Sequence, residues 1–154
     1  MIPKEILKKV KQDYIFSFFL SNGSNNRNYI CKVVTKHTIQ IKTIQSLEEA
    51  EKAIKEIDSD PYSIPIMSPK MVHRVIQIDN VVLQDAIIIK QDMLSIGGEV
   101  AVPQKTFELH QEKARILISG TLHQHRLLVK KLKRHYSRIK QVAFELETLL
   151  DSVS

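Results

Sequence analysis

Apolar side chains recur at every third or fourth position in several segments, which is the spacing of a helix with one buried face. The segment "SLEEAEKAIKEI" (46–57) has this spacing, and Ser46 with Glu49 forms the pattern of a capping box at its start. The spacing returns over 83–96, and again from Thr121 to the C-terminus, where one apolar stripe continues without a break. We therefore predict a helix in each of these segments.

A period of two residues, or a short apolar run, predicts β-strands elsewhere in the chain. "YIFSFFL" (14–20) and "YICKVVT" (29–35) flank a polar cluster of Asn, Ser and Gly, which is typical of a β-hairpin, and a short predicted helix at 3–12 precedes them. Residues 37–45 alternate as in a half-buried strand. The remaining predicted strands are 73–81, 99–103 and the buried segment 113–120.

Strands that alternate with helices indicate the fold class. They predict an α/β fold, with α+β as the alternative, in which helices cover a mixed β-sheet. The length of 154 residues corresponds to about one domain, and the composition, 43% hydrophobic and 26% charged, is that of an ordinary globular protein. We expect one compact unit over 46–154, preceded by an N-terminal helix and hairpin extension over 1–45.

The cysteine content and the apolar runs bear on the cellular compartment. Cys31 is the single cysteine, so no internal disulfide can form, and a reducing cytoplasm is the simplest location. The apolar run 14–20 is shorter than most signal-peptide cores, and no run reaches the ~20 residues of a membrane helix. We expect a cytoplasmic protein with no membrane association.

Gly97 and Gly98 are adjacent in a chain that has four glycines, which raises the question of a phosphate-binding loop. Such loops place phosphate at the N-terminus of a helix, where free N–H groups converge. Here the pair follows a predicted helix and precedes a predicted strand, so carbonyl groups are exposed at that end. We interpret Gly97 as a left-handed helix C-cap rather than as a ligand site.

The junction with the polarity of an anion site is "ISGTLHQHR", where a predicted strand runs into the last helix. Ser119, Gly120 and Thr121 form the turn, with Thr121 as the expected N-cap. Arg126 and Lys130 lie one or two turns along the helix, so a phosphorylated small molecule is the ligand that this terminus suits. An ordinary threonine cap explains the same residues and is favoured, because the glycine-rich P-loop pattern is absent.

The residue types offer no catalytic or metal-binding constellation. The chain has six histidines, and the closest pair, His123 and His125, would point to nearly opposite faces of a helix. No Gly-x-Ser-x-Gly elbow marks a hydrolase. We therefore predict no catalytic residues, no metal site and no cofactor.

Much of the net charge of +6 lies in one basic segment of the C-terminal region. The segment contains Arg126, Lys130, Lys131, Lys133, Arg134, Arg138 and Lys140. A solvated helix face is the simplest interpretation, since runs of charge usually keep a surface wet. Nucleic acid is a second interpretation, which the aromatic share of 6% disfavours because stacking recognition needs aromatic side chains. Recognition of an acidic partner, including a separate catalytic chain, is a third.

Two stretches carry a resemblance to a known family. "IPIMSPKMVHRVIQIDNVVLQDAIIIKQDMLSIGGEVAVP" (64–103) and "ARILISGTLHQHRLLVKKLK" (114–133) resemble the N-terminal accessory domain that precedes the catalytic barrel in dihydropteroate synthases of some clostridia and archaea. The resemblance covers roughly 47–150, and "RHYSRI" departs from the Pro- and Gly-containing break of the family. The family's catalytic Asn-Val-Thr-Pro-Asp-Ser-Phe-Ser run does not occur here, and a barrel needs about 250 residues.

The resemblance implies a place near folate chemistry without the reaction itself. We expect a non-catalytic binding or assembly module that acts as a homo-oligomer or with a separate catalytic chain. One alternative is a small-ligand domain that binds a phosphate or pterin-like compound at Ser119–Thr121. A basic nucleic-acid-binding protein ranks third.

Overall fold

The structure is a computed structural model that describes residues 15–19, 30–34, 37–104, 106 and 112–152. The chain divides into two compact units, Met1–Thr43 and Ile44–Ser154. The helix predicted at 3–12 lies outside the described residues.

The first unit contains a small antiparallel sheet. Strands β1 (Ile15–Phe19), β2 (Ile30–Val34) and β3 (Thr38–Gln40) pair in that order, so the predicted hairpin between β1 and β2 is confirmed. The prediction of a half-buried strand over 37–45 was too long, and its burial was wrong. Ile39 in β3 and Ile41 just after it are 64% and 67% exposed, and neither belongs to the described core.

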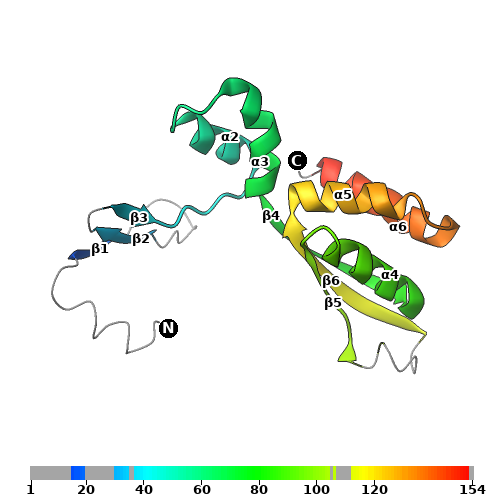
Figure 1. The fold of residues 1–154 in the computed structure, drawn as a ribbon. Coiled ribbons are helices and arrows are strands. Elements are labelled where there is room, and N and C mark those ends of the chain that lie inside the picture. The colour runs from blue at the N-terminus through cyan, green and yellow to red at the C-terminus, as the bar shows by residue number, and fades with distance from the viewer. Residues whose placement is uncertain (1–14, 20–29, 35–36, 105, 107–111, 153–154) are drawn as a thin grey trace. The chain divides into compact units, whose positions relative to one another are not determined.

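The second unit is a compact domain in which helices pack against a sheet (Figure 1). Its elements are α2 (Leu47–Lys55), η1 (Pro61–Ser63), α3 (Ile64–Met71), β4 (His73–Val82), α4 (Leu83–Leu94), β5 (Glu99–Ala101), β6 (Lys113–Thr121), α5 (Leu122–Leu132) and α6 (Ser137–Ser152). The predicted fold class, an α/β or α+β arrangement with helices covering a sheet, is confirmed. Among the described helices, none is both long enough and apolar enough to cross a lipid bilayer.

The sheet has the strand order β4-β6-β5, and both of its pairings are antiparallel. Strands β4 and β5 therefore run parallel to each other with β6 between them, which is a split β-α-β unit connected by α4. The expectation of a mixed sheet was wrong, because both pairs of hydrogen-bonded strands are antiparallel. The chain after β5 returns through β6 into the gap between the two parallel strands, so each neighbour runs in the opposite direction.

The core lies between one face of this sheet and helices α4, α5 and α6, which Figure 1 shows on one side of the strands. Strand β6 alternates buried and exposed side chains along its length, as expected for a sheet that is covered on one face. Each fully buried aliphatic side chain contributes about 1.5–3 kcal/mol to stability. The side chains that meet in the core include Ile76, Ile89, Met93, Val100, Ile116, Ile118, Leu122, Leu128, Leu132, Ile139 and Leu146.

The helix predicted from Thr121 to the C-terminus is two helices. Helix α5 ends at Leu132, and α6 begins at Ser137. A single helix over 122–152 would be about 45 Å long and would extend past the sheet. The break lets Leu132 and Ile139 be buried in the same core.

Helices α2 and α3, in the N-terminal half of this domain, test two further predictions from the sequence. The predicted start of α2 is confirmed: Ser46 Oγ accepts a hydrogen bond from Glu49 N at 3.1 Å. The Glu49 carboxylate accepts from Gln45 N at 2.7 Å rather than from Ser46 N. Helix α3 was not predicted, because Pro65 and Pro69 suggest a turn; the first lies in the opening turn, where a missing N–H costs little.

Candidate functional site

The predicted anion site lies at the junction of β6 and α5, which the sequence folds into a complete capping box. Thr121 is the N-cap, and its hydroxyl accepts a hydrogen bond from Gln124 N at 3.3 Å. The Gln124 side chain closes the box, because Oε1 accepts from Thr121 N at 2.8 Å. The cap predicted from Thr121 is therefore confirmed, and Gln124 is the partner that the analysis of the sequence missed.

Three N–H groups at this helix end, those of Thr121, Leu122 and Gln124, already have acceptors within the chain. Leu122 N donates to Val72 O at 2.8 Å, in addition to the two bonds of the capping box. An anion at this terminus would have to replace protein acceptors, which lowers the free energy available for binding. The small-ligand site stays a prediction.

The other predicted members of this site are only partly brought together. The Ser119 hydroxyl lies 3.3 Å from His73 Nε2. Gly120 is buried and packs against Met93, whose Cε would lie 2.4 Å from an added Cβ. Arg126 is half-buried and interacts within the protein. Lys130 is exposed and lies nine residues beyond Thr121, which corresponds to about 13 Å of helix.

The turn at Gly97 and Gly98 packs against the same junction. Gly97 has a φ of +79°, as the C-cap interpretation predicts. Gly97 N donates to Leu94 O and Gly98 N donates to Met93 O, each at 3.0 Å, which is the hydrogen-bond pattern of a Schellman motif. Gln124 Nε2 donates to Ile96 O at 3.1 Å and so links this turn to the N-terminus of α5.

The Met93 side chain lies between the two glycine turns. A Cβ added at Gly98 would lie 2.2 Å from Met93 Cε, and one added at Gly120 would also overlap it. The two glycine motifs of the sequence therefore form one packed structural unit. Their spacing along the chain gave no sign of this contact, because it depends on how α4 and β6 pack.

His125 is buried under the same junction. Its side chain is 1% exposed, and Nε2 lies 3.1 Å from Arg74 O. Burial lowers the pKa of His125, although the hydrogen bond to Arg74 O opposes this effect. Among the described residues, Nδ1 has no hydrogen-bond partner and no cluster of His, Cys, Asp or Glu could hold a metal ion.

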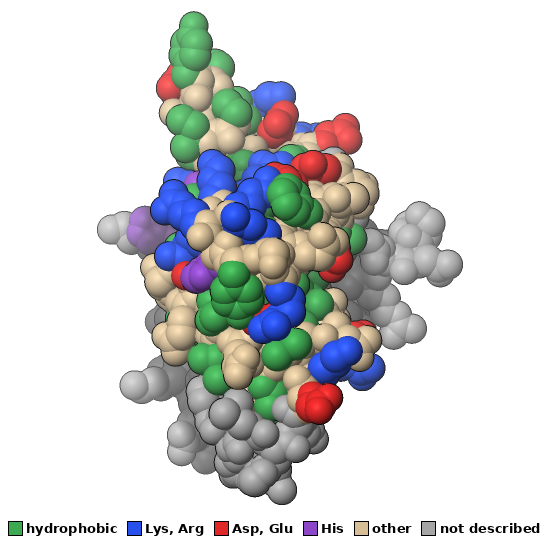
Figure 2. Space-filling view, turned by 90° about the vertical axis from the view of Figure 1, so that its right-hand side faces the viewer, with side chains coloured by type: hydrophobic (Ala, Val, Ile, Leu, Met, Phe, Trp, Pro, Cys, Tyr) green, Lys and Arg blue, Asp and Glu red, His purple; other side chains and the backbone are tan. Residues whose placement is uncertain are grey.

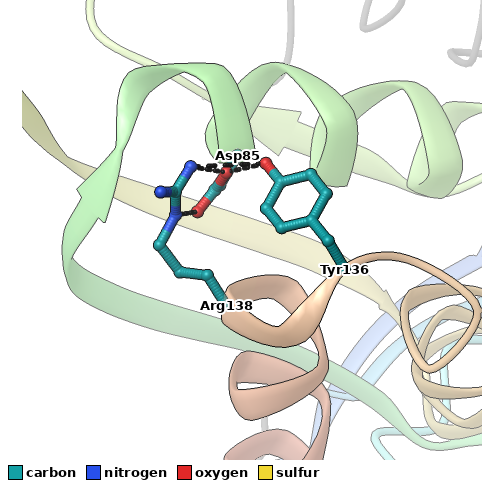
Figure 3. Close-up of polar contacts among 3 residues, drawn as sticks. All are labelled: Asp85, Tyr136 and Arg138. Carbon is teal, nitrogen blue, oxygen red and sulfur yellow. Dashed lines mark hydrogen bonds and ion pairs between the residues drawn. The ribbon is translucent and has the colours of Figure 1, made fainter.

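A second polar cluster joins α4 to the turn before α6 (Figure 3). Asp85 lies in the first turn of α4 and is 1% exposed, and the Tyr136 hydroxyl donates a hydrogen bond to its carboxylate. Arg138 donates from Nη2 to Asp85 Oδ1 at 2.8 Å and from Nε to the other oxygen, which makes a bidentate pair. Burial alone would raise the pKa of Asp85, but the hydrogen bonds from Arg138 and Tyr136 hold that pKa below its usual range.

The Asp85 cluster is best explained as structural. Tyr136 and Arg138 are about half exposed, whereas the carboxylate that they bind is buried. The same hydrogen bond to Asp85 raises the pKa of Tyr136. No sequence pattern indicates this cluster, because Tyr136 and Arg138 lie 51 and 53 residues from Asp85.

Several cations of the basic segment are paired within the chain. Lys131 lies 3.4 Å from the Asp92 carboxylate, whose other oxygen contacts His135, and Lys133 binds both oxygens of Glu147. Figure 2 shows Lys and Arg side chains gathered on one face of the molecule. Three exposed members have no ion pair with another described residue, namely Lys130, Arg134 and Lys140.

The face of the sheet opposite the helices, called here the open face, is exposed. Residues that oppose each other across antiparallel strands lie on the same face. The register therefore makes one row of Val75, Ser119 and Glu99, and a second row of Gln77, Leu117 and Ala101. Beyond these two rows, Arg115 of β6 forms an ion pair with Asp79 of β4. Val75 is 60% exposed and Leu117 is 41% exposed, so this face has an apolar centre among polar neighbours.

Comparisons with known proteins add no relative. No protein-family model, curated protein or solved structure matches the chain.

Proposed function

We propose that the chain is a non-catalytic assembly module that binds a separate catalytic chain through the open face of its sheet. The observation that carries the proposal is the composition of this face. Val75 and Leu117 expose apolar surface on neighbouring strands, and Glu99, Arg115 and Asp79 lie around them. An apolar centre with a polar rim is the usual composition of a protein interface.

The class of partner rests on the resemblance of 64–103 and 114–133 to the accessory domain of dihydropteroate synthases. In that family the domain precedes a catalytic barrel. The partner we propose is therefore a dihydropteroate synthase barrel supplied by another chain, and the proposed location is the cytoplasm. The chain alone is expected to give no turnover with a pterin pyrophosphate and p-aminobenzoate.

The alternatives receive less support from the geometry. A phosphate or pterin-like ligand at Ser119–Thr121 competes with acceptors that the N–H groups of α5 already have. Nucleic acid would have to compete with the internal partners of Lys131, Lys133 and Arg138. The exposed cations Lys130, Arg134 and Lys140 are the one observation for nucleic acid, and the ligand site at Ser119–Thr121 has none that favours it over the open face.

The test measures association of the full chain with a dihydropteroate synthase barrel expressed as a separate protein. Leu117→Asp places a charge at the centre of the open face and should weaken binding by about tenfold or more. Leu149→Asp is the matched control, because Leu149 is 43% exposed and Leu117 is 41% exposed. It lies on α6 and should leave the affinity within about twofold, since a residue outside the interface contributes little to binding.

Each outcome of this test has a meaning. A thermal melt of both variants establishes that they remain folded. If the unaltered chain does not bind the barrel, the proposed partner is wrong. If the chain binds but Leu117→Asp and Leu149→Asp behave alike, the open face is not the interface.

A further inference from the structure

The outer edge of β4 is available for pairing with another strand. Strand β4 lies at the edge of the sheet, with β6 on its inner side. Leu122 N donates to Val72 O at 2.8 Å, so the backbone groups of Val72 point inward. The alternation of an antiparallel strand then points the N–H and C=O groups of Val75 and Gln77 outward. Among the described residues, no backbone hydrogen bond joins these outward groups to another segment.

Proteins usually protect such an edge, and β4 lacks most of the common devices. The other edge strand, β5, is three residues long, whereas β4 has ten residues and contains no proline, glycine or lysine. Its register with β6 is regular from His73 to Ile78. A bulge follows, where Asn80 has a φ of 59° and the regular edge ends.

We infer that this edge pairs with β4 of a second copy of the chain. The two strands run antiparallel about a two-fold axis, and the pairing joins the two three-stranded sheets into one. Because the described residues of this domain have one long regular edge, two copies that pair through it satisfy each other, and the pairing closes at a dimer. The pairing uses backbone groups of β4, whereas the proposed function uses side chains of the open face, and sedimentation of the chain without a barrel tests the pairing separately from the proposed function.

The sequence of β4 is complementary to itself in one register. An axis at Ile76 places Val75 opposite Gln77 of the second copy, and both residues have outward backbone groups. The two-fold axis repeats this pair, so Val75 and Gln77 of each copy face Gln77 and Val75 of the other. In each pair, the N–H of one residue can donate to the C=O of the other in both directions. The same axis places His73 opposite Asp79 of the second copy. Axes at Val75 or Gln77 would instead place His73 opposite Gln77 or Val81, so a contact between His73 and the Asp79 carboxylate selects Ile76.

The end of the strand limits the pairing to this central part. His73 O already accepts a hydrogen bond from Arg74 Nη1 at 3.0 Å, and Arg74 also donates to Gln45 O. The backbone bonds between the copies therefore come from Val75 and Gln77. The His73 imidazole is exposed but lies 3.3 Å from Ser119 Oγ, and Asp79 is paired with Arg115, so a contact between His73 and Asp79 of the second copy would replace these contacts within each chain.

Sedimentation equilibrium of the full chain tests the inference, and the unaltered protein should sediment as a dimer. Val75→Pro removes an outward N–H that the monomer does not use, a substitution that edge strands tolerate. It should produce a monomer, whereas the control Val75→Thr keeps the N–H and should remain dimeric. Circular dichroism melts establish that both variants are folded.

A second pair of variants tests the register without changing the backbone. His73→Glu places a second carboxylate opposite Asp79 of the second copy. The two carboxylates repel each other, and the two-fold axis creates this repulsion twice, so dimerisation should weaken at least about fivefold. His73→Lys places an ammonium group opposite the Asp79 carboxylate and should leave dimerisation unchanged or tighter. A monomeric unaltered chain at about 100 µM, a concentration that would populate a dimer with micromolar affinity, overturns the inference. A dimer that survives both Val75→Pro and His73→Glu also overturns it, because the interface must then lie elsewhere.

Discussion

At the scale of single residues, His125 couples the stability of this protein to pH. The imidazole is buried beneath the junction of β6 and α5, and its Nε2 contacts Arg74 O. Burial disfavours the charged form and lowers the pKa of His125 in the folded state. The stability gained by keeping the ring neutral is therefore fully present above the unfolded pKa, about 6.5. It is lost as the pH falls through the lower pKa of the folded state.

We predict that the free energy of unfolding decreases between about pH 7 and pH 5, with up to about 1.4 kcal/mol per pH unit due to this single proton. Urea unfolding at several pH values measures the slope. His125→Leu should remove this part of the slope, while His123→Gln, at a half-buried position on the same helix, should keep it. An unchanged slope in His125→Leu would mean that another group is responsible.

At the scale of elements, the Asp85 carboxylate fixes the turn before α6 against the start of α4. Tyr136 and Arg138 both donate to it, and the chain between α5 and α6 reverses beside them. A buried carboxylate is stable only when its partners are present, because an unpaired charge loses its hydration without compensation. The cluster therefore links two helices that the core also brings together.

We predict that Asp85→Asn lowers the free energy of unfolding by about 1.5–3 kcal/mol, because hydrogen bonds to a charged acceptor become bonds to a neutral one. Glu147→Gln is the control, since Glu147 also accepts from a cation but is 43% exposed. It should cost less, as exposed pairs are screened by water. Chemical denaturation measures both, and equal losses would show that burial of Asp85 does not matter.

At the scale of the whole molecule, the chain divides into two units, Met1–Thr43 and Ile44–Ser154, and the hydrophobic core lies in the second. The cluster of buried apolar side chains that holds the domain together lies between Ala50 and Leu150, and the partly buried side chains packed against it begin at Ile44. A fragment that contains all of these residues retains the apolar contacts that stabilise the fold.

We predict that a fragment of residues 44–154 folds by itself and unfolds cooperatively, with a free energy of unfolding close to that of the full chain. Calorimetry on both proteins measures the two transitions. A fragment without a cooperative transition would show that residues 1–43 contribute to the stability of the domain.

The sequence by itself determined the features that depend on neighbouring residues. It predicted the start of α2 at Ser46, the cap at Thr121 and the positive φ at Gly97, because a cap or a left-handed residue is specified within one turn of chain. It also located β4, α4 and β6, since their apolar periodicity is set by which face is buried. The prediction that 113–120 is buried on both faces was wrong, because β6 alternates buried and exposed side chains and Leu117 is 41% exposed.

The tertiary structure alone decided how these elements meet. It placed β6 between β4 and β5, ended α5 at Leu132, and joined the two glycine turns around Met93. It also brought Arg138 to a carboxylate 53 residues away. No local pattern encodes such contacts, because they result from burying several apolar faces in one core, and the free energy of that burial depends on the whole arrangement rather than on adjacent residues.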